Sequence, residues 1–400
     1  MAINYGNLST ENVLQTNRLY DVTDAIYLTY PDQSPFIATQ VAAGSMMTSD
    51  PEFWWFTRDD RAKYDQINNG AGYLAGDTSI VVDNADKFVP GDQVVHVKTS
   101  DGSYNETMRI TAVNTGTNTL TVSRGTGSTS AGALADNDYL LRIGSAFEEG
   151  SSLPDPMSQQ LVKYYNYTQI LRTSSVYSRT FLQTKMRAGN RDKEIQKRRQ
   201  EKTEEHKRDI EAMLLWGERG IEGDGTSQPN RKTGGLNYWI NVANAAGFDN
   251  TTSVAAGNLT LAGWESFLEA KAFAFGSDEK YMFCSPRVIS VINNLLRGYV
   301  QLENKLTEYG MNVTKYHSPH GTINIVRHRQ FTTGIYQYAG LIVDPNHVSL
   351  RFINEGVTSF KTDVGLEGND EYEDSWLTEV GLQVTIPQSL ALITNVQAAA

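Results

Sequence analysis

A glycine-rich run at residues 220–227 has the spacing at which backbone amides can cradle a phosphate. In such a loop Gly220 and Gly225 would be followed by lysine, but this chain has Thr226 at that position. The run also follows a predicted helix, whereas a phosphate-binding loop follows a strand. We therefore predict a series of tight turns here and no nucleotide site.

Histidines at positions 317 and 320, with His328 nearby, are the best candidates for a metal site. Two imidazoles three residues apart can converge on one ion when they lie on a helix. Pro319 and Gly321 oppose a helix at this place, and no acidic or thiol partner is evident. The sequence predicts exposed loop histidines, no bound metal and no cofactor.

Acidic side chains gather between positions 363 and 379, but without the alternating Asp/Asn and Gly pattern of a calcium-binding loop. A solvated loop, or one side of an intersubunit ion-pair network against a basic segment such as Lys185–Arg199, fits better. No Gly-x-Ser-x-Gly elbow is present, so we predict no catalytic centre and no enzyme. The cluster consists of Asp363, Glu367, Asp370, Glu371, Glu373, Asp374 and Glu379.

Composition indicates a globular chain of two or three domains. The 400 residues carry a formal charge of −11, which opposes general nucleic-acid binding unless the basic residues are segregated. Cys284 lies in an apolar run and is expected to be a small core residue, which fits a reducing compartment. The polar segment 1–16 predicts no signal peptide, and no window predicts a membrane span.

The segment that must position these groups is Arg191–Trp216, which contains neither Gly nor Pro and predicts a helix of roughly 39 Å. Charged side chains cover most of it, so a rod with so thin an apolar stripe cannot be the centre of a globule. We predict that it lies on a surface and that only its end, from Met213, is anchored in a core. The stripe consists of Ile195, His206, Ile210, Met213 and Leu214.

The first half of the chain predicts segments that need neighbours to cover them. Residues 1–45 predict an extended arm with little core of its own, because Tyr30–Pro35 favours extended or turn geometry. An aromatic strand at Glu52–Phe56 would pair with the alternating segment Leu161–Tyr177 as a long hairpin. Between them, five short strands in residues 73–144 predict a small antiparallel barrel or sandwich.

The second half predicts a layered α/β domain and a strand-rich tail. A helical face runs from Leu261 to Phe275, and a strand at Lys280–Cys284 leads through Ser285 and Pro286 into another helix. Further strands are expected at 311–316, 322–327 and 335–343. The tail from residue 347 predicts strands at 349–353, 357–362, 376–385 and 390–396.

In this order, the segments resemble tailed-bacteriophage major capsid proteins with the Johnson, or Hong Kong 97-like, fold. The resemblance covers the whole chain and depends on the order and spacing of its motifs. Ser34-Pro35-Phe36 upstream of the aromatic strand is similar to the branch that carries an insertion in its extended loop. The other motifs are Glu52-Phe53-Trp54-Trp55, Gly223-Asp224-Gly225-Thr226-Ser227-Gln228-Pro229 and Gly234-Gly235-Leu236.

This resemblance implies an α+β capsid fold with a small inserted all-β domain. The implied parts are an N-terminal arm at 1–45, an extended loop at 46–72 and 145–184, an insertion at 73–144, a peripheral domain at 185–235 and 346–400 with its spine helix at 191–216, and an axial domain at 236–345.

The resemblance also implies a mechanical function. Copies would form pentamers and hexamers of an icosahedral shell around packaged double-stranded DNA, in a virion assembled in the host cytoplasm. A separate scaffolding protein, a portal and a decoration protein are implied partners, and no membrane is involved. Candidate assembly residues are Trp54, Trp55, Arg198, Arg199, Glu204, Glu205, Asp370, Glu371 and Glu373.

Two other functions stay open from the sequence. An encapsulin-like nanocompartment would share the fold and enclose cargo protein, although the inserted barrel favours a viral shell. A carbohydrate-binding or carbohydrate-active protein would use the strands rich in Tyr and Trp, but it lacks a catalytic constellation.

Overall fold

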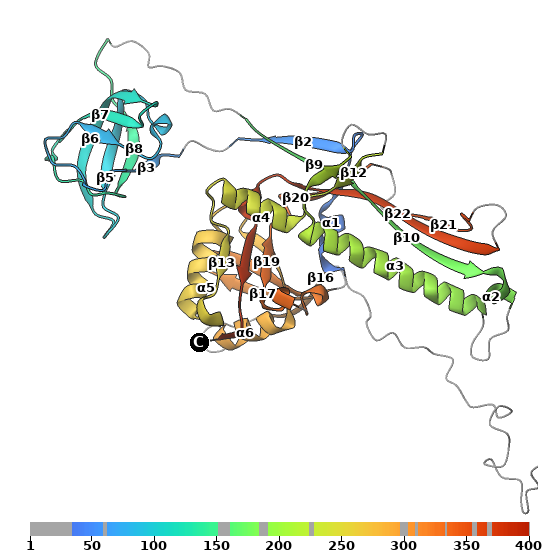
Figure 1. The fold of residues 1–400 in the computed structure, drawn as a ribbon. Coiled ribbons are helices and arrows are strands. Elements are labelled where there is room, and N and C mark those ends of the chain that lie inside the picture. Colours follow the sequence, from blue (N-terminus) through green and yellow to red (C-terminus); the bar gives the residue numbers. More distant parts are fainter. Residues whose placement is uncertain are drawn as a thin grey trace, which may run out of the picture. The chain divides into compact units, whose positions relative to one another are not determined.

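The computed structural model describes residues 34–58, 62–150, 161–183, 191–223, 228–296, 303–308, 311–332, 334–353, 358–365 and 370–399. Its chain divides into two compact units, Met1–Trp55 with Lys163–Ala400, and Phe56–Val162 (Figure 1). The first mixes helices and strands, whereas the second consists mainly of strands. The predicted α+β class is therefore correct. Among the described residues, no helix combines the length and apolar character needed to cross a membrane.

A long helix, α3 (Arg191–Trp216), lies along one face of a five-stranded sheet (Figure 1). Its bounds are those that the sequence predicts. In this sheet β10 (Gln169–Ser178) pairs along its whole length with β22 (Glu371–Val384) in antiparallel register. The remaining strands are β1 (Ser45–Met47), β20 (Val348–Phe352) and β21 (Ser359–Lys361).

The apolar end of α3 enters the main core, as its thin stripe predicts. Ile210, Met213, Leu214 and Leu215 are buried there, together with side chains from the five-stranded sheet. The described residues between 194 and 205 are half-buried or exposed. The helix is thus held by its C-terminal turns and by one face.

Residues 35–43 form a helix, α1 (Pro35–Ala43), where the sequence predicts extended chain; residues 1–33 of the predicted arm lie outside the described ranges. Proline at the first helical position favours helical φ at no cost in hydrogen bonds. Phe36 is fully buried and meets Phe283 edge to face, with ring centroids 5.7 Å apart. This part of the predicted arm therefore lies on the main core, to which Phe36 contributes its side chain.

The aromatic strand β2 (Glu52–Thr57) pairs with β9 (Val162–Tyr167) as a two-stranded ribbon. This pairing agrees with the predicted hairpin only in its first half. After Thr168 the chain continues as β10 in the five-stranded sheet, followed by α2 (Arg179–Gln183). The expected extended loop therefore ends earlier than residue 184, because β22 offers β10 a complete ladder.

The first unit also contains a seven-stranded sheet. Helices α5 (Leu261–Phe267) and α6 (Pro286–Leu296) contribute buried side chains to the same core as this sheet. A π-helical turn (Leu268–Ala272) continues α5, as the predicted helical face requires. In order across the sheet the strands are β13 (Thr251–Ser253), β23 (Ala391–Thr394), β19 (Gly340–Val343), β15 (Glu279–Cys284), β18 (Gly321–Arg327), β17 (Met311–Ser318) and β16 (Glu303–Glu308).

Two predictions for this sheet need correction. The strand expected at 335–343 begins only at Gly340, and Gly334–Tyr338 form a 3-10 helix. The tail does not stay in the peripheral part: β23 pairs with β13 and β19, and β24 (Ala398–Ala399) pairs with β14 (Asn258–Leu259). The apolar run near residue 392 completes the core of the seven-stranded sheet.

The glycine-rich run after α3 contains a short hairpin of β11 (Gly220–Glu222) and β12 (Asn230–Lys232); residues 224–227 lie outside the described ranges. Helix α4 (Leu236–Ala245) follows. Gly235 is required by close approach, because a Cβ there would lie 2.7 Å from the carbonyl oxygen of Leu214. The Gly234-Gly235-Leu236 motif therefore lets α4 start directly against the end of α3.

The second unit contains a six-stranded sheet around one apolar core. An isolated bridge joins Ile67, just after β3, to Val82, just after β4, so the two edge strands of the sheet meet and close it into a barrel. The barrel begins with β3 at residue 64 and not at residue 73, because Ile67 belongs to its core. Its strands in order are β3 (Tyr64–Gln66), β8 (Tyr139–Ser145), β5 (Asp92–Val97), β6 (Tyr104–Asn114), β7 (Thr119–Ser123) and β4 (Ser79–Val81).

A buried ion pair fixes one side of the barrel. Arg124 Nη2 lies 2.7 Å from Glu106 Oε2, and Glu106 also accepts hydrogen bonds from the backbone N–H groups of Gly125 and Gly132. Burial opposes ionisation of this carboxyl, but the hydrogen bonds from Arg124 and the two amides prevail and lower the pKa of Glu106. The glycine-rich loop after β7 is thus tied to β6.

Candidate assembly surfaces

Arg199 of the spine helix binds the sheet of its own subunit. Its Nε donates to Asp374 Oδ2 at 2.7 Å and its Nη2 donates to Asp374 Oδ1 at 3.1 Å, which is the bidentate geometry that favours this pairing. These hydrogen bonds raise the pKa of Arg199. The sequence predicts either a solvated acidic loop or an ion-pair network between subunits, but the Arg199–Asp374 pair lies within one chain, because α3 packs directly on β22.

Farther along α3, His206 joins the helix to both long strands. Its Nδ1 lies 2.9 Å from Thr173 Oγ1 of β10, and its Nε2 lies 2.8 Å from Thr378 Oγ1 of β22. Burial lowers the pKa of His206, so the neutral imidazole is favoured at neutral pH. The indole of Trp376 donates to Thr203 one turn earlier. This side of the spine helix is therefore fixed to its own sheet.

Three further ion pairs join residues three or four apart along α3. Arg198 Nε lies 3.0 Å from Glu194, Lys207 Nζ lies 3.2 Å from Glu204, and Lys202 Nζ lies 2.7 Å from Glu205. Exposed pairs of this kind contribute little to folding. Arg198, Glu204 and Glu205 are therefore available for contacts outside the chain.

Glu211 connects α3 with α1 and the axial part. Its Oε1 accepts a hydrogen bond from the backbone N–H of Phe36 at 2.9 Å and lies 2.6 Å from His328 Nε2. Glu211 and His328 are both fully buried. Sequence reasoning missed this connection, since no local pattern relates residues so far apart along the chain.

The two adjacent tryptophans have different roles. Trp55 is 7% exposed and packs against Trp239 of α4, with ring centroids 5.1 Å apart. Trp54, on the other face of β2, is 54% exposed, and Lys163 Nζ lies 2.8 Å from the centroid of its ring. Trp55 therefore stabilises its own subunit, whereas much of the Trp54 ring stays exposed at the surface of the subunit.

The base of the β2–β9 ribbon is locked to the turn that follows the spine helix. Fully buried Asn166 donates to the carbonyl oxygens of Gly234 and Leu382 and accepts from the N–H of Gly234. Arg219 donates to the carbonyl oxygen of Tyr165, and its guanidinium lies 4.0 Å from the centroid of that residue's ring. The ribbon therefore leaves the main core from a rigid base.

The acidic residues do not form a metal site in the described part of the chain. Arg179 Nε lies 3.8 Å from Asp370, Glu371 is exposed, and Glu373 is half-buried. Glu379 accepts a hydrogen bond from Thr168, and Glu367 lies outside the described ranges. Asp370, Glu371 and Glu373 thus line one end of the five-stranded sheet. That these three residues form assembly contacts stays a prediction.

The three histidines also have separate surroundings. His317 Nδ1 lies 3.0 Å from Thr322 Oγ1 in the β17–β18 hairpin, and His320 Nε2 lies 3.7 Å from Glu265. His328 is buried beside Glu211, and not exposed in a loop as predicted, because it follows β18 into the main core. Within the described ranges, no group of three His, Cys, Asp or Glu side chains is arranged to hold a metal ion.

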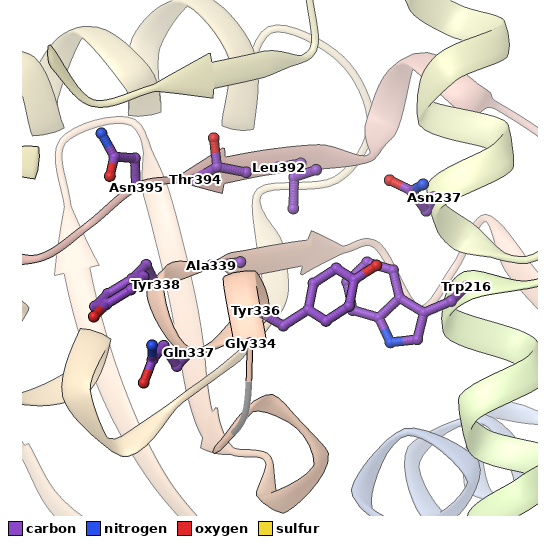
Figure 2. A pocket seen from close by; sticks show the side chains of 10 residues that line it. All are labelled: Trp216, Asn237, Gly334, Tyr336, Gln337, Tyr338, Ala339, Leu392, Thr394 and Asn395. Atoms are coloured by element: carbon purple, nitrogen blue, oxygen red, sulfur yellow. The ribbon is translucent and has the colours of Figure 1, made fainter.

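A pocket of about 670 Å³ opens where α3 ends, beside the 3-10 helix and β23 (Figure 2). Trp216 and Tyr336 stack there with ring centroids 3.9 Å apart, and Asn237 contributes an amide. Sequence reasoning missed the pocket because it assigned residues 335–339 to a strand. The lining comprises Trp216, Asn237, Gly334, Tyr336, Gln337, Tyr338, Ala339, Leu392, Thr394 and Asn395.

Comparisons with known proteins show the family to which the chain belongs. A family model described as "SU10 major capsid protein" matches residues 6–397. The chain belongs to this family. It is also 28% identical over 349 residues to a major capsid protein of Pseudomonas phage PaMx41, a match that covers 80% of this chain and 79% of that one.

Solved structures with low similarity are also found. A chain from Mycobacterium phage Bobi is 8% identical with a TM-score of 0.48 and covers 97% of this chain and 99% of its own. The capsid of Myoviridae phage XM1 is 11% identical with a TM-score of 0.41, covering 96% and 98%. The encapsulin SrpI from Synechococcus elongatus is 12% identical with a TM-score of 0.40, covering 61% and 78%.

Membership in this family confirms the main prediction from the sequence. The protein is a major capsid protein of a phage, and copies of it build the shell of a virion. It is a structural protein, and its functional surfaces are those that meet other copies. Exposed side chains such as Trp54 are therefore the ones to test.

Proposed function

We propose that the protein assembles into pentamers and hexamers of an icosahedral head that encloses double-stranded DNA. Assembly takes place in the host cytoplasm with a separate scaffolding protein and a portal, and a decoration protein binds the finished shell. The chain acts mechanically and catalyses no reaction. The resemblance described above supplies these partners, and the charge and exposed surfaces of the chain support the proposal.

The observation that carries the proposal is the exposed face of the β2–β9 ribbon. Trp54 and Phe56 are 54% and 59% exposed on one face of β2, while Phe53 and Trp55 are buried on the other. A two-stranded ribbon is marginal by itself in water, and large exposed aromatic side chains mark interaction sites. A neighbouring subunit that covers this face stabilises both copies.

Candidate assembly residues now fall into two groups. Trp54, Arg198, Glu204, Glu205, Asp370, Glu371 and Glu373 are the proposed contacts with neighbours, because the surface of the subunit leaves them at least partly accessible. Trp55 and Arg199 act indirectly by holding the ribbon and the spine helix in place.

A net charge of −11 supports a container that does not bind DNA over its whole surface, because like charges repel wherever basic residues are not gathered locally. An encapsulin-like shell, the rival hypothesis, would enclose protein cargo and would not need a negative net charge. Among the described residues we find no site that supports carbohydrate binding. The ring of Trp216, which could stack on a sugar, is covered on one side by Tyr336.

The experiment compares purified wild type with Trp54→Ser, using Trp54→Phe as the conservative control. Electron microscopy should show closed shells for wild type and Trp54→Phe and a shell yield lower by at least about tenfold for Trp54→Ser, because loss of a large interface aromatic typically costs at least about 2 kcal/mol per contact. Circular dichroism should show all three subunits folded. Equal shell yields for all three proteins would contradict the role of Trp54, and soluble monomers of wild type under every condition would contradict the proposed function.

A further inference from the structure

One face of the sheet formed by β10, β22 and β21 points away from α3. The face toward α3 carries Thr173 and Trp376, which bind the helix. Side chains alternate along a strand, so their neighbours in sequence lie on the opposite face. We call this second face the outer sheet face. Arg172, Ser375, Leu377, Ser359 and Lys361 are among the residues that it carries.

The register brings two cations of this face around one small pocket. Arg172 of β10 lies opposite Leu377 of β22, and Leu377 lies opposite Ser359 of β21. Lys361 is two residues farther along β21, so its Cα lies about 10 Å across and about 7 Å along the strands from that of Arg172. The long side chains of these residues line a pocket of about 190 Å³ with Ser359, Ser375 and Leu377.

Both cations lack an acidic partner among the described residues. The exposed side chains of Arg172 and Lys361 form no ion pair there, whereas the nearby cations Arg179 and Arg199 bind Asp370 and Asp374. The acids on the same face lie in the adjoining rows: Glu379 lies opposite Ile170, where it accepts a hydrogen bond from Thr168, and Glu373 lies opposite Val176. These two cations make the pocket locally positive in a chain whose net charge is −11.

We propose that this pocket binds a phosphate group. Arg172 offers a planar fork of donors, Lys361 offers an ammonium group, and Ser375 offers a hydroxyl beside them. Ser359 Oγ donates at 3.4 Å to the carbonyl oxygen of Leu377, a long bond that an anion can replace. Donors from three strands suit a group with three or four acceptor oxygens better than a carboxylate, which has two.

The same chemistry fits free phosphate and the backbone of DNA. Arg172 and Lys361 are both exposed, so their charges can be reached from outside the subunit. The assignment of the phosphate group to DNA rests on the proposed function, because DNA is present only if the shell encloses it. Binding of inorganic phosphate by the isolated chain does not require a shell.

The experiment uses the purified full-length chain and two probes. Titration calorimetry measures inorganic phosphate, and fluorescence anisotropy measures a short labelled duplex of random sequence. Arg172→Gln and Lys361→Gln should each weaken phosphate binding about tenfold, the effect of losing one charge-assisted hydrogen bond. Arg179→Gln removes the same charge from an exposed site near the end of the same sheet and should leave affinity within about twofold.

Competition between the two probes shows whether the phosphate group that binds the pocket belongs to DNA or is free phosphate. Displacement of the duplex by phosphate, with both losing affinity in the two variants, supports the site and DNA as its ligand. Phosphate binding without duplex binding supports the site with free phosphate as its ligand. Absence of phosphate binding to wild type, or equal affinity in all variants, overturns the site.

Two further outcomes separate this site from the shell. If wild type binds no phosphate and the variants stop shell formation, the outer sheet face is a subunit contact and the proposal fails. If phosphate binds as expected but wild type forms no shell, the proposed function fails and the phosphate site stands.

Discussion

At the scale of single residues, Lys280 of β15 is the most unusual titratable group. It is fully buried, and its Nζ donates to the carbonyl oxygens of Phe275 at 2.6 Å and Ser389 at 2.8 Å. Burial lowers the pKa of Lys280 to about 8, although the carboxylate of Asp344 partly opposes the shift. Lys280 therefore joins β15 to its neighbours by hydrogen bonds, but near neutral pH its charged form is destabilised by burial.

The sign of its pH dependence follows from proton counts. Between the folded pKa of about 8 and the unfolded value near 10.4, the unfolded chain binds more protons, so the contribution of Lys280 to stability rises with pH. We predict that the unfolding free energy of wild type, relative to Lys280→Met, rises by about 3 kcal/mol across this window. Below about pH 8 this difference should be nearly constant.

Denaturant unfolding followed by tryptophan fluorescence measures this change, because all six tryptophans lie in the first unit. Lys271→Met is the matched control, since Lys271 Nζ is held by Asp249 at 2.8 Å close to the surface. A difference between wild type and Lys280→Met that does not change over this window would contradict the lowered pKa.

At the scale of elements, the sequence predicts those whose signal is local. The ends of α3 follow from its composition, and α6 begins at Pro286 as the Ser-Pro pair indicates. The alternation in residues 161–177 predicts strands but cannot tell which partner each half takes, so β10 was assigned to the wrong sheet. For the same reason β23 was placed in the peripheral part: its partners β13 and β19 are distant in sequence.

The sequence predicts which types of side chain contact neighbouring subunits, but it predicts only in part which of these side chains are exposed. Charged residues on α3 were recognised from composition, but a helix can bury a charged side chain wherever a partner strand supplies the opposite charge, as Asp374 does for Arg199. Trp54 and Trp55 differ only by the alternation of β2, whose phase depends on the core that it joins. Arg172 and Lys361 carry no motif and meet only through strand register.

One face of the spine helix binds its own sheet, and we propose that its exposed face contacts neighbouring subunits. Charge reversal on each face can separate the two functions. We predict that Arg199→Glu lowers the unfolding free energy by about 3 kcal/mol, because it leaves the fully buried Asp374 without its cation. Glu204→Lys, Glu205→Lys and Arg198→Glu should each change it by less than about 1 kcal/mol, since their pairs are exposed.

Shell yield should show a different pattern in these variants. Electron microscopy of assembly reactions should show fewer closed shells for the three exposed-face variants although their subunits stay folded. Tryptophan fluorescence measures the unfolding of each subunit separately from assembly. Normal shell yield in all three variants would place the contacts of α3 elsewhere.

At the scale of the whole molecule, the chain combines a main unit that is interrupted in sequence with a continuous inserted one. The inserted barrel has its own core, a closed sheet and a buried Glu106–Arg124 pair. A closed barrel has no free edge strand that would need a neighbour. We therefore expect residues 62–150 to fold as an independent domain that was added to the capsid fold.

Removing this domain tests both its independence and its function. We predict that a chain with residues 62–150 replaced by a short flexible linker keeps the tryptophan-monitored unfolding of the main unit, because the barrel contributes no residue to either of the other two cores. Shells of this variant should form but dissociate at lower temperature, if the insertion reinforces contacts between subunits. Equal thermal stability of the two shells, measured by light scattering, would contradict that function. Deletion of residues 73–144 alone is the informative comparison: it leaves β3 and the core residue Ile67 without partners, so this variant should aggregate where the longer deletion stays soluble.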